Sequence, residues 1–238
     1  MIKIVFLHGL VGSKNNFEYL EKEFPKYQTL SFDLLGFGNE TKPDIDYSLG
    51  DFIKFLESKL NLSEENDTQY VLVGHSLGSL LAKELTKKYP HKIKKVFLIA
   101  YPFLDKDKVL GNRSFFDESY VGGELWTKMI CEIRIIFKYL FLPIIFLFKY
   151  KYRKSYLDYF KHTYQSAFGT LHNTILKDKK EDLFNISDKI VFINGEKDKS
   201  VDLEFAKKFK HYVIKSMGHL FFNYERDIVK IIKLNLDY

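Results

Sequence analysis

The feature that most constrains the fold is a buried strand that passes through a tight turn directly into a helix. Tyr70 to Val73 is an almost unbroken apolar run, as expected for a strand covered on both faces. It continues into Gly74-His75-Ser76-Leu77-Gly78, and then into a predicted helix over Leu77–Tyr89 whose leucines share one face. Pro90 follows directly and favours an end to that helix. This pattern is typical of a parallel sheet flanked by helices.

The same alternation of short apolar runs and amphipathic stretches extends over most of the chain. It predicts an α/β fold with a mostly parallel sheet of about six strands and right-handed crossovers. Strands are expected over Ile2–Leu7, Tyr27–Phe32, Tyr70–Val73, Val96–Ala100, Ile190–Asn194 and Tyr212–Lys215. Helices are expected over Asn15–Glu23, Leu49–Leu60, Leu77–Tyr89, Leu203–Lys208 and Phe221–Asn235.

The alternation is interrupted in the middle of the chain. From Tyr101 to about Asn185 the sequence reads as helices and loops without a clear strand. We therefore expect an α/β core built from residues 1–100 and 186–238, with residues 101–185 inserted as a helical cap.

Composition restricts the class of protein. The chain has 238 residues, 46% hydrophobic and 29% charged, which suits one packed domain with an insertion. Its net charge of +6 is spread among mixed signs, as in Glu21-Lys22-Glu23, and this argues against a nucleic-acid partner. The single cysteine, Cys131, excludes an intramolecular disulfide and a cysteine-based metal site, and no metal or cofactor is expected. The apolar N-terminal run is too short for a signal peptide, so a cytoplasmic location is the default expectation.

Ser76 is the candidate nucleophile. A Gly-x-Ser-x-Gly sequence between a strand and a helix predicts a strained turn that exposes the serine above the sheet edge. Side chains at Gly74 and Gly78 would collide with the neighbouring strand and helix. The helix that begins after Ser76 also favours negative charge nearby. His75 is interpreted as structural.

The loop after the first strand is the candidate oxyanion site. It reads His8-Gly9-Leu10-Val11-Gly12-Ser13. Acyl transfer needs two N–H donors aimed at the developing oxyanion. In an architecture of this type one comes from the residue after the nucleophile and the other from this loop. The backbone N–H groups of Leu10 and Leu77 are therefore the predicted donors.

Two later strands each end in a candidate catalytic residue. Asp198 follows the strand at Ile190–Asn194, and His219 follows the strand at Tyr212–Lys215. Both should lie at the carboxyl edge of the sheet, where active sites of open α/β sheets collect. A serine hydroxyl needs a base to take its proton, a histidine can do so near neutral pH, and a carboxylate fixes the imidazole tautomer. This predicts a triad of Ser76, His219 and Asp198.

Other residues of the same types are weaker candidates. Glu196, Asp202 and Asp105 are the competing acids. Asp33 precedes the serine, which is the wrong order for this fold, and is interpreted as stabilising a turn. The remaining histidines lack a comparable context and are expected on the surface or in the cap: His91, His162, His172 and His211.

Taken together, these motifs resemble those of the α/β-hydrolase superfamily, in particular its small, cap-bearing esterase-like and lipase-like members. The resemblance rests on His8-Gly9, Gly74 to Gly78, Asp198, and Gly218-His219 followed by Glu225. It covers the core and leaves the cap unmatched. It implies a Ser-His-Asp mechanism with a covalent acyl-enzyme and no cofactor. A serine at the elbow argues against the haloalkane dehalogenase and epoxide hydrolase branches, which carry Asp there.

The resemblance leaves several outcomes open. The same triad serves menaquinone-pathway lyases, carbon–carbon bond hydrolases and acyltransferases, and the same fold serves non-catalytic hormone receptors. Fold and triad do not determine the substrate. The sequence also leaves the oligomeric state open.

An apolar stretch in the predicted cap bears on the substrate. Residues 129–148 are rich in Ile, Leu and Phe, but Glu132, Arg134 and Lys138 interrupt them, which argues against a span of about 20 apolar residues. The cap either packs this stretch on the core or touches a membrane peripherally through residues 129–154, where four basic residues follow: Lys149, Lys151, Arg153 and Lys154. In both cases a hydrophobic pocket is expected, which favours a small carboxylic ester with an apolar acyl group.

Overall fold

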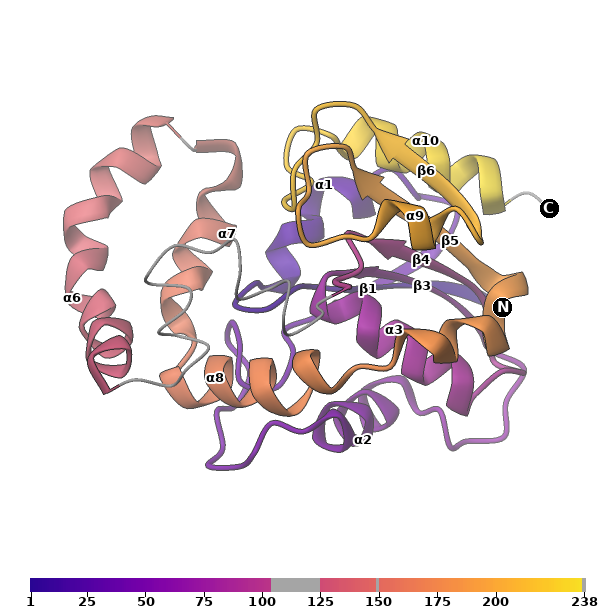
Figure 1. The fold of residues 1–238 in the computed structure, drawn as a ribbon, viewed down its shortest axis with the longest axis horizontal. Helices are drawn as coiled ribbons and strands as arrows, with labels where there is room; N and C mark the ends of the chain where they lie inside the picture. Colours follow the sequence, from indigo (N-terminus) through magenta and orange to yellow (C-terminus); the bar gives the residue numbers. More distant parts are fainter. Residues whose placement is uncertain (104–124, 149, 237–238) are drawn as a thin grey trace.

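The computed structural model describes residues 1–103, 125–148 and 150–236 (Figure 1). Six strands form one sheet in the order β2-β1-β3-β4-β5-β6, and every neighbouring pair is parallel. The prediction of an α/β fold with about six mostly parallel strands is confirmed. The strands are β1 (Ile2–Leu7), β2 (Gln28–Phe32), β3 (Gln69–His75), β4 (Ile93–Ile99), β5 (Ile190–Gly195) and β6 (Lys210–Ile214).

Helices cover both faces of the sheet, as Figure 1 shows. Successive residues of a strand point to opposite faces, so each central strand contributes to two separate cores. Val5 and Leu72 pack with the side chains of α2 (Leu49–Leu60) and α3 (Leu77–Lys88). Ile4 and Val71 pack with α1 (Glu18–Glu21) and α10 (Glu225–Leu236) on the other face. This double burial explains why β1 and β3 read as continuous apolar runs.

The strand order reverses beside β1. From β1 the chain moves outward to β2, and then returns to place β3 on the opposite side of β1. The loops that follow β1 and β3 therefore start side by side at the carboxyl edge of the sheet and leave in opposite directions. The crevice between two such loops is where ligands bind in open α/β sheets.

Several element boundaries differ from the sequence-based expectations. The strand expected to begin at Val96 begins at Ile93, because ladder pairing with β3 extends over its lysines. The helix expected from Asn15 is a 3₁₀ turn at Lys14–Phe17 followed by the short α1. The last helix begins at Glu225 and not at Phe221, since Asn223 adopts a positive φ of 74° that interrupts a helix.

The described residues between β4 and β5 form helices and 3₁₀ turns, with no strand among them. In Figure 1 α6 (Leu125–Phe148) stands apart from the sheet, on the far side of α7 (Arg153–Asp158) and α8 (Tyr164–Asn173). Among the helices in the described parts of the chain, none combines the length and apolar character needed to cross a bilayer. The boundaries of the predicted cap, 101–185, stay a prediction. The described 3₁₀ turns between β4 and β5 lie at Tyr150–Tyr152, Tyr159–Lys161, Ile175–Lys177 and Lys180–Lys189. The short α9 (Leu203–Ala206) lies between β5 and β6.

A buried ion pair fixes the segment that returns from α8 to the sheet. The ammonium of Lys83, on α3, lies 2.5 Å from Oδ1 of Asp178, and its side chain is fully buried. The hydroxyl of Tyr101, which directly follows β4, donates to Oδ2 of Asp178 at 2.5 Å. A buried charge of this kind is tolerated only when it is paired, so this contact fixes where the returning segment meets the core.

Candidate active site

The turn after β3 places Ser76 in a strained backbone conformation. Its φ and ψ are 52° and −115°, and its N–H donates to the carbonyl of Ile99 at 3.0 Å. A Cβ at Gly74 would lie 2.3 Å from the carbonyl oxygen of Gly78, and a Cβ at Gly78 would lie 2.0 Å from that of Leu7. The two glycines are therefore required by close backbone approach, which matches the sequence-based explanation of the elbow.

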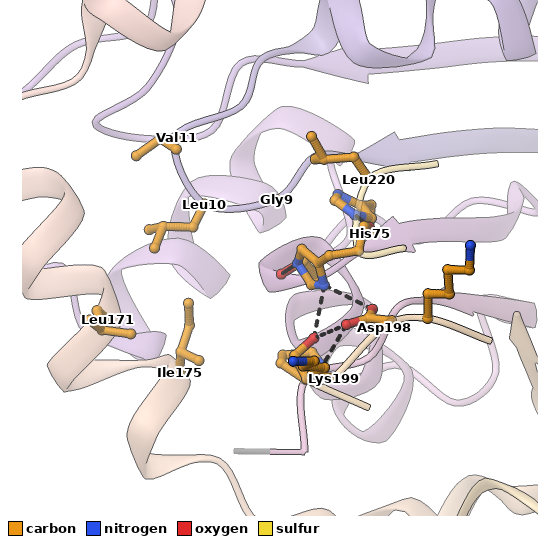
Figure 2. Close-up of a pocket in the computed structure, with 14 residues that line it drawn as sticks. Gly9, Leu10, Val11, His75, Leu171, Ile175, Asp198, Lys199 and Leu220 are labelled. Carbon is orange, nitrogen blue, oxygen red and sulfur yellow. Dashed lines mark hydrogen bonds and ion pairs between the residues drawn. The ribbon is translucent and has the colours of Figure 1, made fainter. Parts of the chain in front are cut away.

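Three side chains from separate strand ends meet at this turn. His219 Nε2 lies 3.0 Å from Ser76 Oγ, and His219 Nδ1 lies 2.9 Å from Asp198 Oδ2. Figure 2 marks the contacts of Asp198 with dashed lines. Within this chain of contacts the imidazole can accept a proton from the serine on one nitrogen while it donates to the carboxylate with the other.

Asp198 is buried and hydrogen-bonded on both carboxylate oxygens. Oδ1 accepts from the Ser200 backbone N–H at 2.9 Å and from its hydroxyl at 2.6 Å. Burial raises the pKa of Asp198, but the hydrogen bonds from His219 and Ser200 outweigh it, so the pKa lies below its ordinary value. The carboxylate is therefore ionised at neutral pH and available to orient an imidazole.

Ser200 is a member of this group that sequence reasoning missed. Its hydroxyl also lies 2.9 Å from His219 Nδ1, so it contacts both the acid and the imidazole. The signal that could have found it is the spacing Asp198-Lys199-Ser200, because an aspartate often accepts from the backbone N–H two residues later.

The competing acids occupy other positions. Glu196 accepts from the backbone N–H of Ser216, and Asp202 caps the first turn of α9 through the N–H of Phe205. Asp105 lies outside the described residues. Asp33 accepts from two backbone N–H groups, those of Lys14 and Asn39, both at 2.9 Å, so its interpretation as a turn-stabilising residue is confirmed.

His75 holds the loop that carries His219. Its buried ring donates from Nε2 to the backbone carbonyl of His219 at 2.8 Å. Burial, together with the neighbouring His219, lowers the pKa of His75 to about 3. His75 is therefore neutral, with its proton on Nε2, and the structural role expected for it takes the form of a contact to the histidine loop.

The buried His75 ring should make the unfolding free energy of the protein depend on pH. An unfolded chain protonates histidine near pH 6.5, whereas His75 in the folded protein does so only near 3. The contribution of the neutral His75 ring to the unfolding free energy is therefore complete above pH 6.5 and is lost progressively as the pH falls towards 3. His75→Gln keeps a donor nitrogen but cannot be protonated. We expect the unfolding free energy of this variant to decline less steeply with falling pH than that of the parent, by up to about 1.4 kcal/mol per pH unit below about pH 6. Urea unfolding between about pH 7 and pH 5 measures this slope.

His91→Gln, which replaces an exposed histidine, is the control for this prediction. It should leave the pH dependence of the unfolding free energy as in the parent. An equal slope in the parent and in both variants would contradict the prediction.

His8 fixes the conformation of the loop after β1. Its buried Nδ1 donates to the carbonyl of Gly9 at 2.8 Å, and its Nε2 accepts from the N–H of Leu34 at 2.9 Å. The Gly9 carbonyl also accepts from the N–H of Gly12 at 3.0 Å. In a trans peptide the following N–H points opposite to the carbonyl. The N–H of Leu10 is thereby turned away from the loop interior, and Leu10 itself lines the cavity beside Ser76.

A cavity of about 660 Å³ opens over Ser76. Figure 2 shows Leu171 and Ile175 on the side opposite Asp198, with Leu10 and Val11 above them. Leu171 belongs to α8 and Ile175 to the turn after it, so the inserted segment supplies one apolar wall. Lys197 and Lys199 line the same cavity and are exposed. Within the described residues no group of three or more His, Cys, Asp or Glu side chains is arranged to hold a metal ion.

The segment 150–158 contacts the loop that carries His219. The Tyr152 hydroxyl donates to Glu225 Oε1 at 2.6 Å and accepts from the backbone N–H of Asn223 at 2.7 Å. Its ring stacks on Phe222 with centroids 4.4 Å apart. These contacts fix the chain between His219 and α10, and they explain why α10 begins only at Glu225.

The other end of the same segment contacts the loop that carries Leu10. Asp158 is buried at the end of α7, and its Oδ2 accepts from the Asn15 amide at 2.6 Å. Burial raises the pKa of Asp158, but hydrogen bonds from Lys161, Ser13 and Asn15 outweigh it and bring the pKa below its ordinary value. The segment 150–158 thus joins the candidate oxyanion loop to the candidate base loop, a connection that sequence reasoning missed.

Removal of one hydroxyl should test this connection. Tyr152→Phe leaves the Asn223 N–H without the hydroxyl acceptor and leaves Glu225 with Lys151 but without the tyrosine donor, so the loop after His219 should lose its fixed position. We expect kcat for ester cleavage, the activity proposed below, to fall by about tenfold with little change in KM, since one buried hydrogen bond is worth roughly 1–1.5 kcal/mol. Steady-state kinetics on a soluble ester measures both constants.

Tyr89→Phe is the matched control for this prediction. Tyr89 also donates to a carboxylate, Glu57 Oε1 at 2.8 Å, but it lies between α2 and α3, away from the cavity. Its loss should leave kcat unchanged. Equal effects of the two substitutions would show that Tyr152 acts on general stability alone.

Comparison with known proteins agrees with the fold. A family model described as the alpha/beta hydrolase fold matches residues 3–123. The chain is 26% identical over 238 aligned positions to BODYGUARD 5 of Arabidopsis thaliana, named a probable lysophospholipase, with 87% of this chain and 54% of that protein covered. It is 33% identical over 107 positions to the 1-acylglycerol-3-phosphate O-acyltransferase ABHD5 of Rattus norvegicus, covering 40% and 28%.

A solved structure from a study of carboxylesterases of Nitrososphaera gargenis superposes with a TM-score of 0.72 at 15% identity, covering 99% of this chain and 90% of that one. At that identity the likeness concerns the fold alone. The chain spans about half the length of the curated relatives it matches. Because the family model matches half of the sequence and the six-stranded parallel sheet agrees with it, the chain belongs to the α/β-hydrolase fold family.

Proposed function

We propose that this protein is a serine hydrolase that cleaves a carboxylic ester with an apolar acyl group. The proposal rests on one observation above all. Ser76 Oγ, His219 and Asp198 form a continuous chain of contacts of 3.0 Å and 2.9 Å at the wall of a cavity. Serine is a useful nucleophile only when a base is within reach of its proton, and these distances satisfy that condition.

The proposed reaction begins with attack of Ser76 Oγ on the ester carbonyl carbon. His219 Nε2 takes the hydroxyl proton as the new C–O bond forms, and Asp198 stabilises the resulting imidazolium. The carbonyl oxygen becomes an oxyanion, and in this proposal the N–H groups of Leu10 and Leu77 bind it. Leu77 is the first residue of α3, so its N–H has no partner within that helix.

Collapse of the tetrahedral intermediate breaks the bond to the alcohol. His219 gives its proton to the departing alkoxide, and the acyl group remains on Ser76. Water then attacks the acyl-enzyme in the same way: His219 takes one proton, the acid leaves, and the serine hydroxyl is restored. No residue changes oxidation state, and water is the only co-substrate.

The lining of the cavity supports a single-chain lipid ester as the substrate class. Leu10, Val11, Leu171 and Ile175 offer apolar contacts to an acyl chain, while Lys197 and Lys199 offer positive charge to a phosphate. The name of the Arabidopsis relative, a probable lysophospholipase, agrees with this chemistry. We therefore propose a lysophospholipid as the candidate substrate.

Release of fatty acid tests this proposal. We expect lysophosphatidylcholine to be hydrolysed faster than diacyl phosphatidylcholine, and p-nitrophenyl esters to be cleaved with a preference for longer acyl chains over acetate. Faster cleavage of acetate than of any longer ester would overturn the apolar acyl specificity. A folded protein that neither cleaves an ester nor reacts with a fluorophosphonate would favour a non-catalytic ligand receptor.

Acyl transfer is the second candidate, because the rat relative is named as an acyltransferase. The acyl-enzyme on Ser76 would then pass its acyl group to an alcohol in place of water. Addition of lysophosphatidate to the same assay distinguishes the outcomes. New phosphatidate at the expense of free fatty acid would support transfer, and unchanged fatty acid release would support hydrolysis. Reaction with a fluorophosphonate without turnover of any ester would favour a lyase or carbon–carbon bond hydrolase.

A further inference from the structure

The face of α6 that points away from the rest of the protein carries large apolar side chains in contact with solvent. Leu125, Leu140 and Leu147 are 74%, 67% and 77% exposed. Three further side chains of the same helix are also exposed: Met129, Ile133 and Ile144. In Figure 1 α6 lies at the end of the molecule farthest from β6, and it contacts α7 and α8.

These six residues share one face because of their spacing. They follow one another at intervals of four, four, seven, four and three residues, which at 3.6 residues per turn keeps them within about a third of the helix circumference. At 1.5 Å per residue the stripe is about 33 Å long. We call these six residues the α6 apolar face. Isolated exposed leucines are ordinary on a protein surface, but six large apolar side chains exposed on one face of a helix mark an interaction site.

The sequence of the segment that carries this face is strongly basic. Residues 125–154 contain seven basic residues and one acidic residue, a net +6 that equals the net charge of the whole chain. Two of the basic residues, Lys151 and Lys154, pair with Glu225 and Glu18, which lie outside the segment. The single acidic residue of the segment, Glu132, accepts from the backbone N–H of Tyr164 on α8.

We propose that the α6 apolar face docks on an anionic lipid surface. An apolar helical stripe beside an excess of positive charge is the combination that binds in the interface of such a bilayer. The charge also argues against a second copy of this chain as the occupant, because two segments of net +6 would face each other. Docking places α8 and its wall of the cavity near the lipid, since α6 contacts α8 directly.

Vesicle flotation tests this docking without the proposed chemistry. The Ser76→Ala protein is used throughout, so that the vesicles remain intact and failure of the proposed hydrolysis does not affect the result. We expect it to float with vesicles of equal parts phosphatidylcholine and phosphatidylglycerol and to dissociate from them at high salt. Its affinity for pure phosphatidylcholine vesicles should be lower by about tenfold or more. Replacing Leu140, Ile144 and Leu147 together by Gln should weaken binding to anionic vesicles by about a thousandfold, because each of the three buried side chains contributes roughly tenfold.

Leu234→Gln is the control, since Leu234 is 53% exposed on α10, at another part of the surface. It should bind like its parent, and thermal unfolding should show that all variants remain folded. Binding of the triple variant as tight as its parent would overturn the proposal. Equal binding to neutral and anionic vesicles would overturn it as well. A dimer in sedimentation velocity that the triple variant abolishes would assign the face to a second copy.

Discussion

Replacing Ser76 by alanine should lower ester turnover by roughly 10⁴- to 10⁶-fold, because removal of a triad nucleophile leaves only the contribution of binding and the oxyanion donors. Within the described residues the Ser76 side chain makes one hydrogen bond, to His219 Nε2, and its backbone contacts do not involve the hydroxyl. The variant should therefore keep the parent's unfolding free energy. It should also lose covalent reaction with a fluorophosphonate completely, since the substitution removes the oxygen that reacts.

Ser58→Ala is a suitable control for this substitution. Ser58 is an exposed serine on α2, and its loss should change neither labelling nor turnover. Persistent labelling of the Ser76→Ala protein would move the nucleophile elsewhere and remove the basis of the proposed function. Loss of labelling together with full ester turnover would do the same, because a covalent intermediate on Ser76 would then be unnecessary.

The sheet could be predicted from sequence because its signals are local. Strands buried on both faces, such as β3, must be apolar throughout, and amphipathic helices must show their period of 3.6. The elbow was predictable for a similar reason. Gly74 is required by the backbone of Gly78 in the same turn, and Gly78 is required by the backbone of Leu7 on the adjacent strand. Both glycines lie within five residues, so the constraint appears in the sequence as a short motif.

The contacts among Ser76, Asp198 and His219 could be anticipated through topology. Each residue follows a strand, and in a parallel sheet all carboxyl ends lie at one edge. Chain order then selected Asp198 over Asp33. The distances themselves could not be derived, because they depend on the rotamers and loop conformations after β5 and β6.

The supporting contacts could not be predicted from sequence. Tyr152 and Asp158 lie in a segment without any motif, and their partners Glu225 and Asn15 are more than 70 residues away. Such pairs carry no local periodicity, so nothing in the composition of the segment indicates them. The late start of α10 has the same origin, since the Tyr152 hydroxyl takes the N–H of Asn223 and favours a loop over a first helical turn.

The second large effect is expected at Asp198, because the carboxylate determines which imidazole nitrogen carries the proton. Asp198→Asn presents an amide that can donate to His219 Nδ1, which leaves the proton on Nε2, the atom that faces Ser76. An imidazole in that tautomer cannot take the serine proton. We expect kcat to fall by roughly 10³- to 10⁴-fold with little change in KM, measured by steady-state hydrolysis of a p-nitrophenyl ester.

Ser200 sharpens this experiment. Its hydroxyl also lies 2.9 Å from His219 Nδ1 and can accept a proton from it, so it should preserve part of the correct tautomer in the Asp198→Asn protein. Ser200→Ala alone should cost about tenfold, and the double variant should lose more than Asp198→Asn alone. Asp105→Asn, at the competing acid outside the described residues, should leave kcat within a few-fold of the parent. If instead Asp105→Asn removed activity and Asp198→Asn retained it, the acid would be Asp105, and the hydrogen bond between Asp198 and His219 would have only a structural role.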